Sequence, residues 1–131
     1  MTLSRYQLSK LALRLDRRYA ELLEEVRGEL ERSENTQYVE LIDRSPADIG
    51  DQSLGDALAD LNLAMIDRHI GELRDIEAAR ARMHDRSFGT CIDCGSLMAY
   101  ERLLAYPTAK RCFACQRQRE RTYADYKMPT L

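Results

Sequence analysis

The chain has 131 residues, of which 44% are hydrophobic, 32% are charged and 7% are aromatic, and it has no tryptophan. This composition excludes wholesale disorder, but it supplies few of the bulky residues that fill a large globular core. The formal net charge of −2 gives no strong general attraction to DNA, whose nonspecific binding is mostly electrostatic. We therefore expect an elongated protein whose main partner is another protein.

Charge is distributed unevenly, and no segment is apolar enough for export or membrane insertion. Residues 1–87 carry 13 Lys and Arg against 18 Asp and Glu, whereas residues 88–131 carry 7 against 4. The basic C-terminal part is therefore the candidate surface for nucleic acid. Charged residues interrupt the N-terminus from Arg14 onward, and no apolar segment reaches the roughly 18 residues of a membrane span. We expect a cytoplasmic protein without a signal peptide.

Two segments, residues 4–33 and residues 53–86, have apolar side chains every three or four residues and contain no proline, which predicts two long helices. The first set is Leu8, Leu11, Leu15, Tyr19, Leu22, Val26 and Leu30. The second set is Leu54, Leu58, Leu61, Met65, Ile66, Ile70, Leu73, Ile76, Ala79 and Met83. Neither helix can bury its stripe alone. The expected fold is mainly α, a long antiparallel hairpin (a coiled coil) of a monomer, with a seam between two chains as the alternative.

Between the two helical segments lie Ser, Asn, Pro and Gly residues that are typical of turns, with a short helix expected over residues 38–43. Asp51 or Ser53 is a suitable N-cap for the second helix. Residues 40–60 hold six acidic side chains against Arg44 alone. Taken by themselves, these acids indicate a solvated tip with helix-capping carboxylates.

All four cysteines fall in one short stretch, as the pairs Cys91 with Cys94 and Cys112 with Cys115. Two residues between thiolates let one turn of backbone present both sulfurs to one ion, and two such turns complete a tetrahedral site. Gly95 suits the tight turn because it can take a positive φ. With four thiolates no coordination position stays open, so the spacing predicts one structural zinc ion rather than a catalytic one.

Other uses of the thiols are less well supported. Two disulfides would require an oxidising compartment, an iron–sulfur cluster also takes four cysteines, and a thioredoxin-like pair would not need the second Cys-x-x-Cys. His69 and His84 are surplus to a four-cysteine site, and we interpret them as surface or packing residues.

The segment after Cys115, "QRQRERTYADY", predicts a short basic helix that packs on the base of the hairpin or contacts phosphate, with packing favoured. The expected organisation is therefore a helical hairpin over residues 1–87, with an acidic tip loop near 44–53, followed by a zinc-finger module and a C-terminal helix over residues 88–131.

A helical hairpin followed by this cysteine module resembles the DksA/TraR family of bacterial transcription factors. The similarity is densest at "FGTCIDCG", at "RLLAYPTAKRC" and at "CQ", and it extends over roughly residues 35–120. The resemblance implies a regulator that binds RNA polymerase and inserts the hairpin into its secondary channel, the pore through which nucleotides reach the active site. It also implies that the protein has no enzymatic activity.

The resemblance also changes the interpretation of the acidic loop. The family carries an Asp-x-x-Asp-x-Ala motif at the hairpin tip, and the gapless match here is Asp48, Asp51 and Ser53, with Ser where the family has Ala. Carboxylates brought into a confined channel interact more strongly with a metal ion or a basic side chain than they do in water. We therefore expect the tip, and Asp51 above all, to contact the partner.

This sequence departs from the family at the site that DksA shares with polymerase for the alarmone ppGpp. By the same gapless count, three basic positions of that site hold Asp75, Tyr106 and Gln116. We therefore expect action on open complexes and initiation without ppGpp at the protein's own site. The alternative hypothesis is a structural zinc module on a coiled-coil dimer that binds DNA through its basic C-terminal end, whereas the first hypothesis requires no sequence-specific DNA binding.

Overall fold

The structure is a computed structural model and describes residues 3–44 and 52–127. The described part is mainly helical, as expected, and its only β pairing is an isolated bridge between Thr90 and Leu97. The helices are α1 (Arg5–Arg32), α2 (Gln37–Arg44), α3 (Gln52–Ala59), α4 (Ala64–His84), α5 (Tyr100–Ala105) and α6 (Phe113–Lys127).

Helix α1 has the extent that the sequence predicts. The Gln7 backbone N–H donates to Ser4 Oγ at 3.1 Å and the Ser4 N–H donates to Gln7 Oε1 at 2.9 Å, so both free N–H groups are satisfied reciprocally. The buried side chains of α1 are the predicted stripe from the second position on: Leu11, Leu15, Tyr19, Leu22, Val26 and Leu30.

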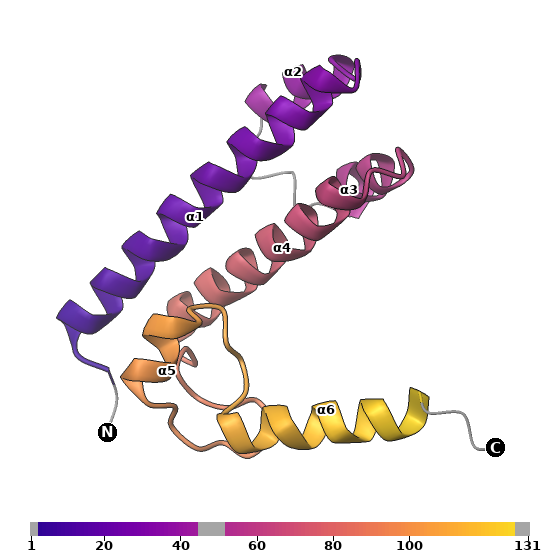
Figure 1. Cartoon of the computed structure of the whole chain (residues 1–131). Coiled ribbons are helices and arrows are strands. Elements are labelled where there is room, and N and C mark those ends of the chain that lie inside the picture. Colours follow the sequence, from indigo (N-terminus) through magenta and orange to yellow (C-terminus); the bar gives the residue numbers. More distant parts are fainter. Residues whose placement is uncertain (1–2, 45–51, 128–131) are drawn as a thin grey trace.

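Helices α1 and α4 lie side by side and run in opposite directions (Figure 1). Helix α4 contributes Ile66, Ile70, Leu73, Ile76 and Ala79 to the shared core. Polar contacts flank this core, such as Arg80 Nη2 with Asp16 Oδ1 at 2.7 Å and the Tyr19 hydroxyl donating to Glu77 Oε1 at 2.8 Å. We call these two helices the arms.

The prediction of one continuous helix over residues 53–86 is wrong, because α3 ends at Ala59 and α4 begins only at Ala64. Between them Asn62 has a φ of 60°, a left-handed conformation that asparagine tolerates better than most residues. The turn directs α3 back along α4 and leaves Leu58 fully buried in the core. Burial of a leucine stabilises by roughly 2 kcal/mol, which offsets the roughly 1–2 kcal/mol of a left-handed residue.

The other arm turns back in the same way. Glu34, with a φ of 62°, ends α1, and the Asn35 N–H donates to the Leu30 carbonyl at 2.8 Å. The expected short helix is present as α2 and runs back along α1, since Arg27 Nη1 lies 3.1 Å from Asp43 Oδ1. The turns at residues 33–36 and 60–63 therefore form the far end of the arms (Figure 1).

At the opposite end, the cysteine module packs on the base of the arms. Phe88, Met98 and Leu103 belong to the same continuous cluster of buried residues as the arm core. The Arg14 guanidinium of α1 also donates to the Leu104 carbonyl of α5. The position of this module relative to the arms is therefore fixed by shared apolar burial.

Candidate metal centre and its surroundings

The structure brings the four cysteines together. One Sγ atom from each of Cys91, Cys94, Cys112 and Cys115 lies within 4.8 Å of the other three. The Cys94 and Cys112 sulfurs are 3.8 Å apart, which is close to the S–S edge of about 3.8 Å of a tetrahedron with Zn–S bonds near 2.3 Å. The four thiols are thus positioned to bind one metal ion.

Backbone hydrogen bonds build the first pair of thiols into a tight turn. The Gly95 N–H donates to the Cys91 carbonyl at 3.0 Å, and the Cys91 N–H donates to the Ser96 carbonyl at 2.8 Å. Gly95 has a φ of 76°, so the predicted need for glycine directly after Cys94 is confirmed.

The second pair lies where α6 begins. Cys112 immediately precedes the helix and Cys115 is in its first turn, so the helix starts earlier than the sequence suggested. The Cys115 N–H approaches Cys112 Sγ at 3.5 Å, as a helix N-terminus can do for an anionic sulfur. The first turn of α6 therefore positions the sulfurs of this pair, as the turn at Gly95 positions those of the first pair.

Two contacts join the pairs to each other, and sequence reasoning missed both. The Ile92 N–H donates to the Lys110 carbonyl at 2.9 Å. Arg111, whose side chain is only 10% exposed, donates from Nε to Asp93 Oδ2 at 2.8 Å. Since Asp93 lies between the first two cysteines and Arg111 precedes the third, this ion pair holds the two turns in register.

The thiols differ in how readily they ionise. Burial opposes ionisation of Cys91, but backbone N–H groups of Cys94, Cys112 and Asp93 outweigh it and lower the pKa of this thiol to about 6. The Ser96 hydroxyl, whose Oγ lies 3.2 Å from Cys94 Sγ, lowers the pKa of Cys94.

Cys115 ionises less readily than Cys91 and Cys94. Hydrogen bonding to the neighbouring sulfurs, that of Cys112 first, raises the pKa of Cys115. Four sulfurs at this spacing therefore cannot all ionise without a cation among them. Zn²⁺ provides that cation and takes four thiolates in a closed site, so the residues present fit a structural zinc ion.

The predicted tip residues are only partly within the described structure. Asp48 and Asp51 lie outside the described residues, and Ser53 is the second residue of α3. The tip assignment thus stays a prediction.

The three positions that replace basic residues of the family's alarmone site are brought together. Asp75, Tyr106 and Gln116 line one pocket of about 150 Å³ at the junction of α4, α5 and α6. Four basic side chains also line it: Arg102, Lys110, Arg111 and Arg119. Two of these side chains already make contacts within the zinc finger: Arg111 is paired with Asp93, and Arg102 Nε donates to the Arg111 carbonyl at 3.0 Å.

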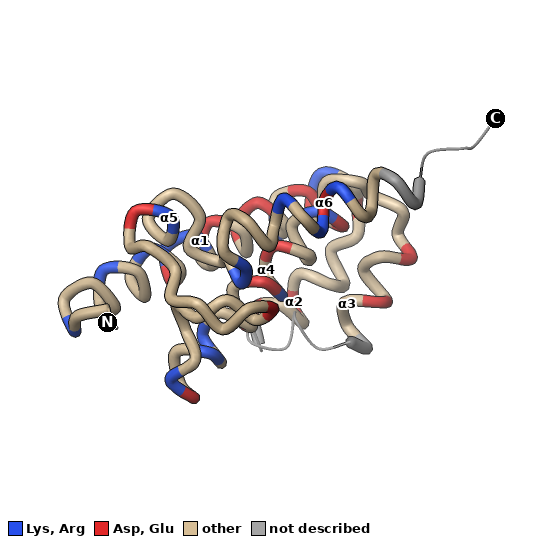
Figure 2. Tube along the Cα trace, turned by 90° about the horizontal axis from the view of Figure 1, so that it is seen from below, with Lys and Arg blue, Asp and Glu red and all other residues tan. Residues whose placement is uncertain are grey.

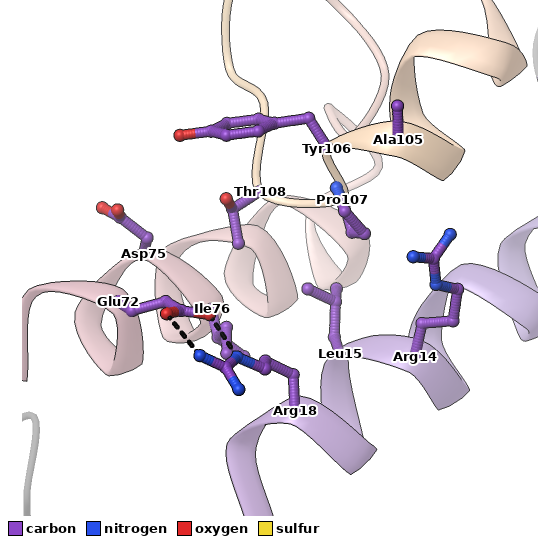
Figure 3. A pocket seen from close by; sticks show the side chains of 10 residues that line it. All are labelled: Arg14, Leu15, Arg18, Glu72, Asp75, Ile76, Ala105, Tyr106, Pro107 and Thr108. Carbon is purple, nitrogen blue, oxygen red and sulfur yellow. Dashed lines mark hydrogen bonds and ion pairs between the residues drawn. The ribbon is translucent and has the colours of Figure 1, made fainter. Parts of the chain in front are cut away.

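A larger groove of about 410 Å³ lies on the neighbouring face, between α1, α4 and residues 105–108 (Figure 3). Its floor includes Leu15 and Ile76, and its polar wall includes Arg18, which holds Glu72 by two hydrogen bonds of 2.6 and 3.0 Å. That bidentate pair lowers the pKa of Glu72. Arg18 and Glu72 thus neutralise each other, whereas Arg14 and Asp75 contribute further charged groups to the lining of the groove.

The position of the C-terminal helix, α6, differs from the one that the sequence predicts. Residues 117–124 are all exposed, and α6 leads away from the arms, so the interpretation that it packs on their base is wrong (Figure 1). Its charged residues are mostly basic (Figure 2), whereas α3 has a single charged residue, Asp56. Arg117 lies over the ring of Phe113, which is 61% exposed.

None of the helices in the described part of the chain is long and apolar enough to cross a bilayer. Neither a curated protein nor a solved structure matches the chain. Residues 86–121 match the family model of the prokaryotic DksA/TraR C4-type zinc finger. These residues include all four thiols, and the expectation of one structural zinc ion is confirmed by this match together with the close approach of the sulfurs. The chain thus carries a C4-type zinc finger of the DksA/TraR family.

Proposed function

We propose that this protein is a cytoplasmic regulator of transcription that binds RNA polymerase and does not catalyse a reaction. The observation that carries the proposal is a DksA/TraR zinc finger packed on the base of two long helical arms. The finger packs on the base of the arms and so fixes the direction in which the arms point. In this proposal the arms are an antiparallel hairpin that enters the secondary channel and changes the stability of open complexes.

Charge supports a protein partner over DNA. The acidic excess of residues 1–87, 18 Asp and Glu against 13 Lys and Arg, lies in residues 33–63 between the arms, which hold seven acidic residues against Arg44 alone. An acidic segment is repelled by the phosphate backbone and attracted to basic groups that surround a catalytic metal ion. We therefore propose a monomer that reaches promoters through polymerase and not through sequence-specific DNA contacts.

The exposed basic side chains of α6 support a second candidate function. Arg117, Arg119 and Arg121 are exposed, and their helix leads away from the arms (Figure 1), so this helix is accessible to nucleic acid. Co-purification with core polymerase, set against gel shifts with bare DNA, separates the two candidates. Binding to DNA without binding to polymerase would favour the second.

The first functional prediction concerns Asp51. Asp51→Asn should keep association with core polymerase and lose most regulation of open complexes, because the arm sides and the zinc finger offer far more contact area than one carboxylate does. The measurements are polymerase binding and in vitro transcription from a ribosomal and an amino-acid-biosynthesis promoter.

A matched control is Asp56→Asn, which removes the same charge from an exposed position of α3. The control should regulate like the unmodified protein. If Asp51→Asn regulates equally well, the tip assignment is wrong even though the polymerase proposal can stand.

The second functional prediction is that ppGpp does not act at the protein's own interface with polymerase. A site for this alarmone needs Arg or Lys donors for phosphate oxygens, and each such charge-assisted bond is worth about 1.5–3 kcal/mol. Asp75, Tyr106 and Gln116 supply none, and one of them repels phosphate. Transcription by a polymerase that lacks its own separate alarmone site should respond to this protein equally with and without ppGpp.

A several-fold increase with ppGpp would contradict the prediction and would point to Lys110 and Arg119, the basic pocket residues that make no contact with Asp93 or a backbone carbonyl. In that case the variant with Lys110→Ala and Arg119→Ala should abolish the increase. If the increase persists, ppGpp binds elsewhere.

A further inference from the structure

The far end of the arms is held by two unusual turns. Glu34 and Asn62 have φ values of 62° and 60°, in the left-handed region that residues with a Cβ rarely adopt. Neither turn contains glycine or proline, the residues that normally end a helix in this way. Local sequence therefore does not require the chain to turn at either position.

The sequence on both sides of the second turn fits a straight helix equally well. Leu54, Leu58, Leu61 and Met65 recur at intervals of four, three and four residues across it. In the structure Leu58 is buried, whereas Leu61 and Met65 are only half-buried. A continuous helix would extend the apolar face of α4 through the same residues and would restore the helical hydrogen bonds that the turn interrupts.

The turned-back arrangement has a close contact of its own. Gly55 of α3 lies so near Arg74 of α4 that a Cβ on Gly55 would overlap the Arg74 guanidinium. The guanidinium is the movable end of a long side chain, so a change of its rotamer is enough to open this contact. The packing of α3 on α4 thus depends mainly on Leu58 and its apolar neighbours.

We propose that the far end of the arms has two forms. In the folded-back form, which the structure shows, α2 and α3 lie along α1 and α4. In the straight form, α3 continues α4 and α2 continues α1, and their apolar residues pack on each other as an extension of the arm core. Asn62 and Glu34 are the two hinges.

Opening of one hinge favours opening of the other. If α3 alone straightened, residue 52 would lie 12 residues, or about 18 Å, beyond the start of α4. Asp43 of α2 meanwhile stays beside Arg27, about 9 Å behind the end of α1. The nine residue steps from Asp43 to residue 52 span at most about 32 Å, so the chain could bridge this separation only when almost fully extended, which disfavours straightening of α3 alone.

The consequence for activity rests on the proposed function. The straight form would lengthen the arms by residues 52–63, about 18 Å, and place the start of α3 at their far end. A channel that accepts only the straight form would select it from the equilibrium. The equilibrium itself is a property of the free protein and is tested without polymerase.

The test is the distance between two spin labels, measured by double electron–electron resonance on the zinc-loaded full chain. A genetically encoded keto amino acid at positions 56 and 81, both exposed, carries the labels and spares the zinc thiols. The folded-back form places the labels about 15 Å apart, from the 55–74 contact and helix spacing. The straight form places them about 38 Å apart. We expect both distances.

Substitution of the hinges should change the ratio of the two distances in opposite directions. Asn62→Ala should favour the long distance and Asn62→Gly the short one, because glycine is free of the left-handed penalty and is poorer inside a helix. Their long-to-short ratios should differ by about tenfold or more. Glu34→Ala should also favour the long distance between positions 56 and 81, since the hinges are coupled.

Arg86 provides a matched control, because it has a φ of 69° but lies after α4, outside the hinges. Arg86→Ala should leave the ratio unchanged. One short distance in every variant, or one long distance in every variant, would overturn the proposal. A response to Asn62→Ala without one to Glu34→Ala would overturn the coupling. If both forms exist but core polymerase does not enrich the long distance, the polymerase link is wrong while the two forms stand.

Discussion

Replacing Cys91 with Ser should abolish zinc retention and unfold the zinc finger, while much of the helicity of α1 to α4 survives. Serine is a far weaker zinc ligand than a thiolate, so the site would keep only three sulfurs. Apparent binding free energies of structural zinc are about 10–16 kcal/mol, and in small modules this energy is the folding energy. The finger has little core of its own with which to replace it.

The measurements are metal content by mass spectrometry and helix content by circular dichroism, with and without a strong chelator. Ser96→Ala is the matched control, because it removes the hydroxyl beside Cys94 and leaves all four sulfurs. This control should keep one zinc ion per chain. Iron with visible absorption in the unmodified protein, or a full zinc content in Cys91→Ser, would contradict the assignment.

The metal centre was largely predictable because its determinants are local. The spacing of the four cysteines fixes which atoms can reach one ion, and Gly95 marks the turn that aims two of them. The ion pair of Asp93 with Arg111 was not predictable, since it joins residues 18 positions apart. Its only sequence signal is that both residues are adjacent to cysteines.

The apolar stripes of the arms were also predictable, but their ends were not. Periodicity shows which face of a helix is apolar and says nothing of where the chain turns back when no glycine or proline marks the place. Asn62 therefore lies in the middle of a segment that indicates a continuous helix. The turn depends on burying Leu58 against residues that are distant in the chain, which is a tertiary effect.

For the C-terminal helix, the sequence predicts a packing contact that the structure does not contain. The basic segment after Cys115 predicts a helix that packs on the base of the arms, yet residues 117–124 are exposed. The sequence contains the reason, because its polar and charged residues leave no continuous apolar face with which to pack. The zinc finger instead meets the arms through Phe88, Met98 and Leu103, which come from its other segments.

Leu22→Ala should lower the free energy of unfolding of the arms by about 3 kcal/mol, within the range of 2–5 kcal/mol found for buried leucines. Leu22 is fully buried between the arms, so the substitution removes apolar contacts and leaves a cavity. Helix propensity does not contribute to the loss, because alanine is at least as good a helix former as leucine. The measurement is thermal and urea unfolding followed by circular dichroism.

Leu13→Ala makes the same chemical change on the same helix at a side chain that is 49% exposed, and it should change stability by only about 0.5 kcal/mol. Both variants should keep one zinc ion per chain, because neither position touches the sulfurs. Equal losses in the two variants would show that the buried stripe does not hold the arms together. A zinc loss in Leu22→Ala would show instead that the finger depends on the arm core for its own folding.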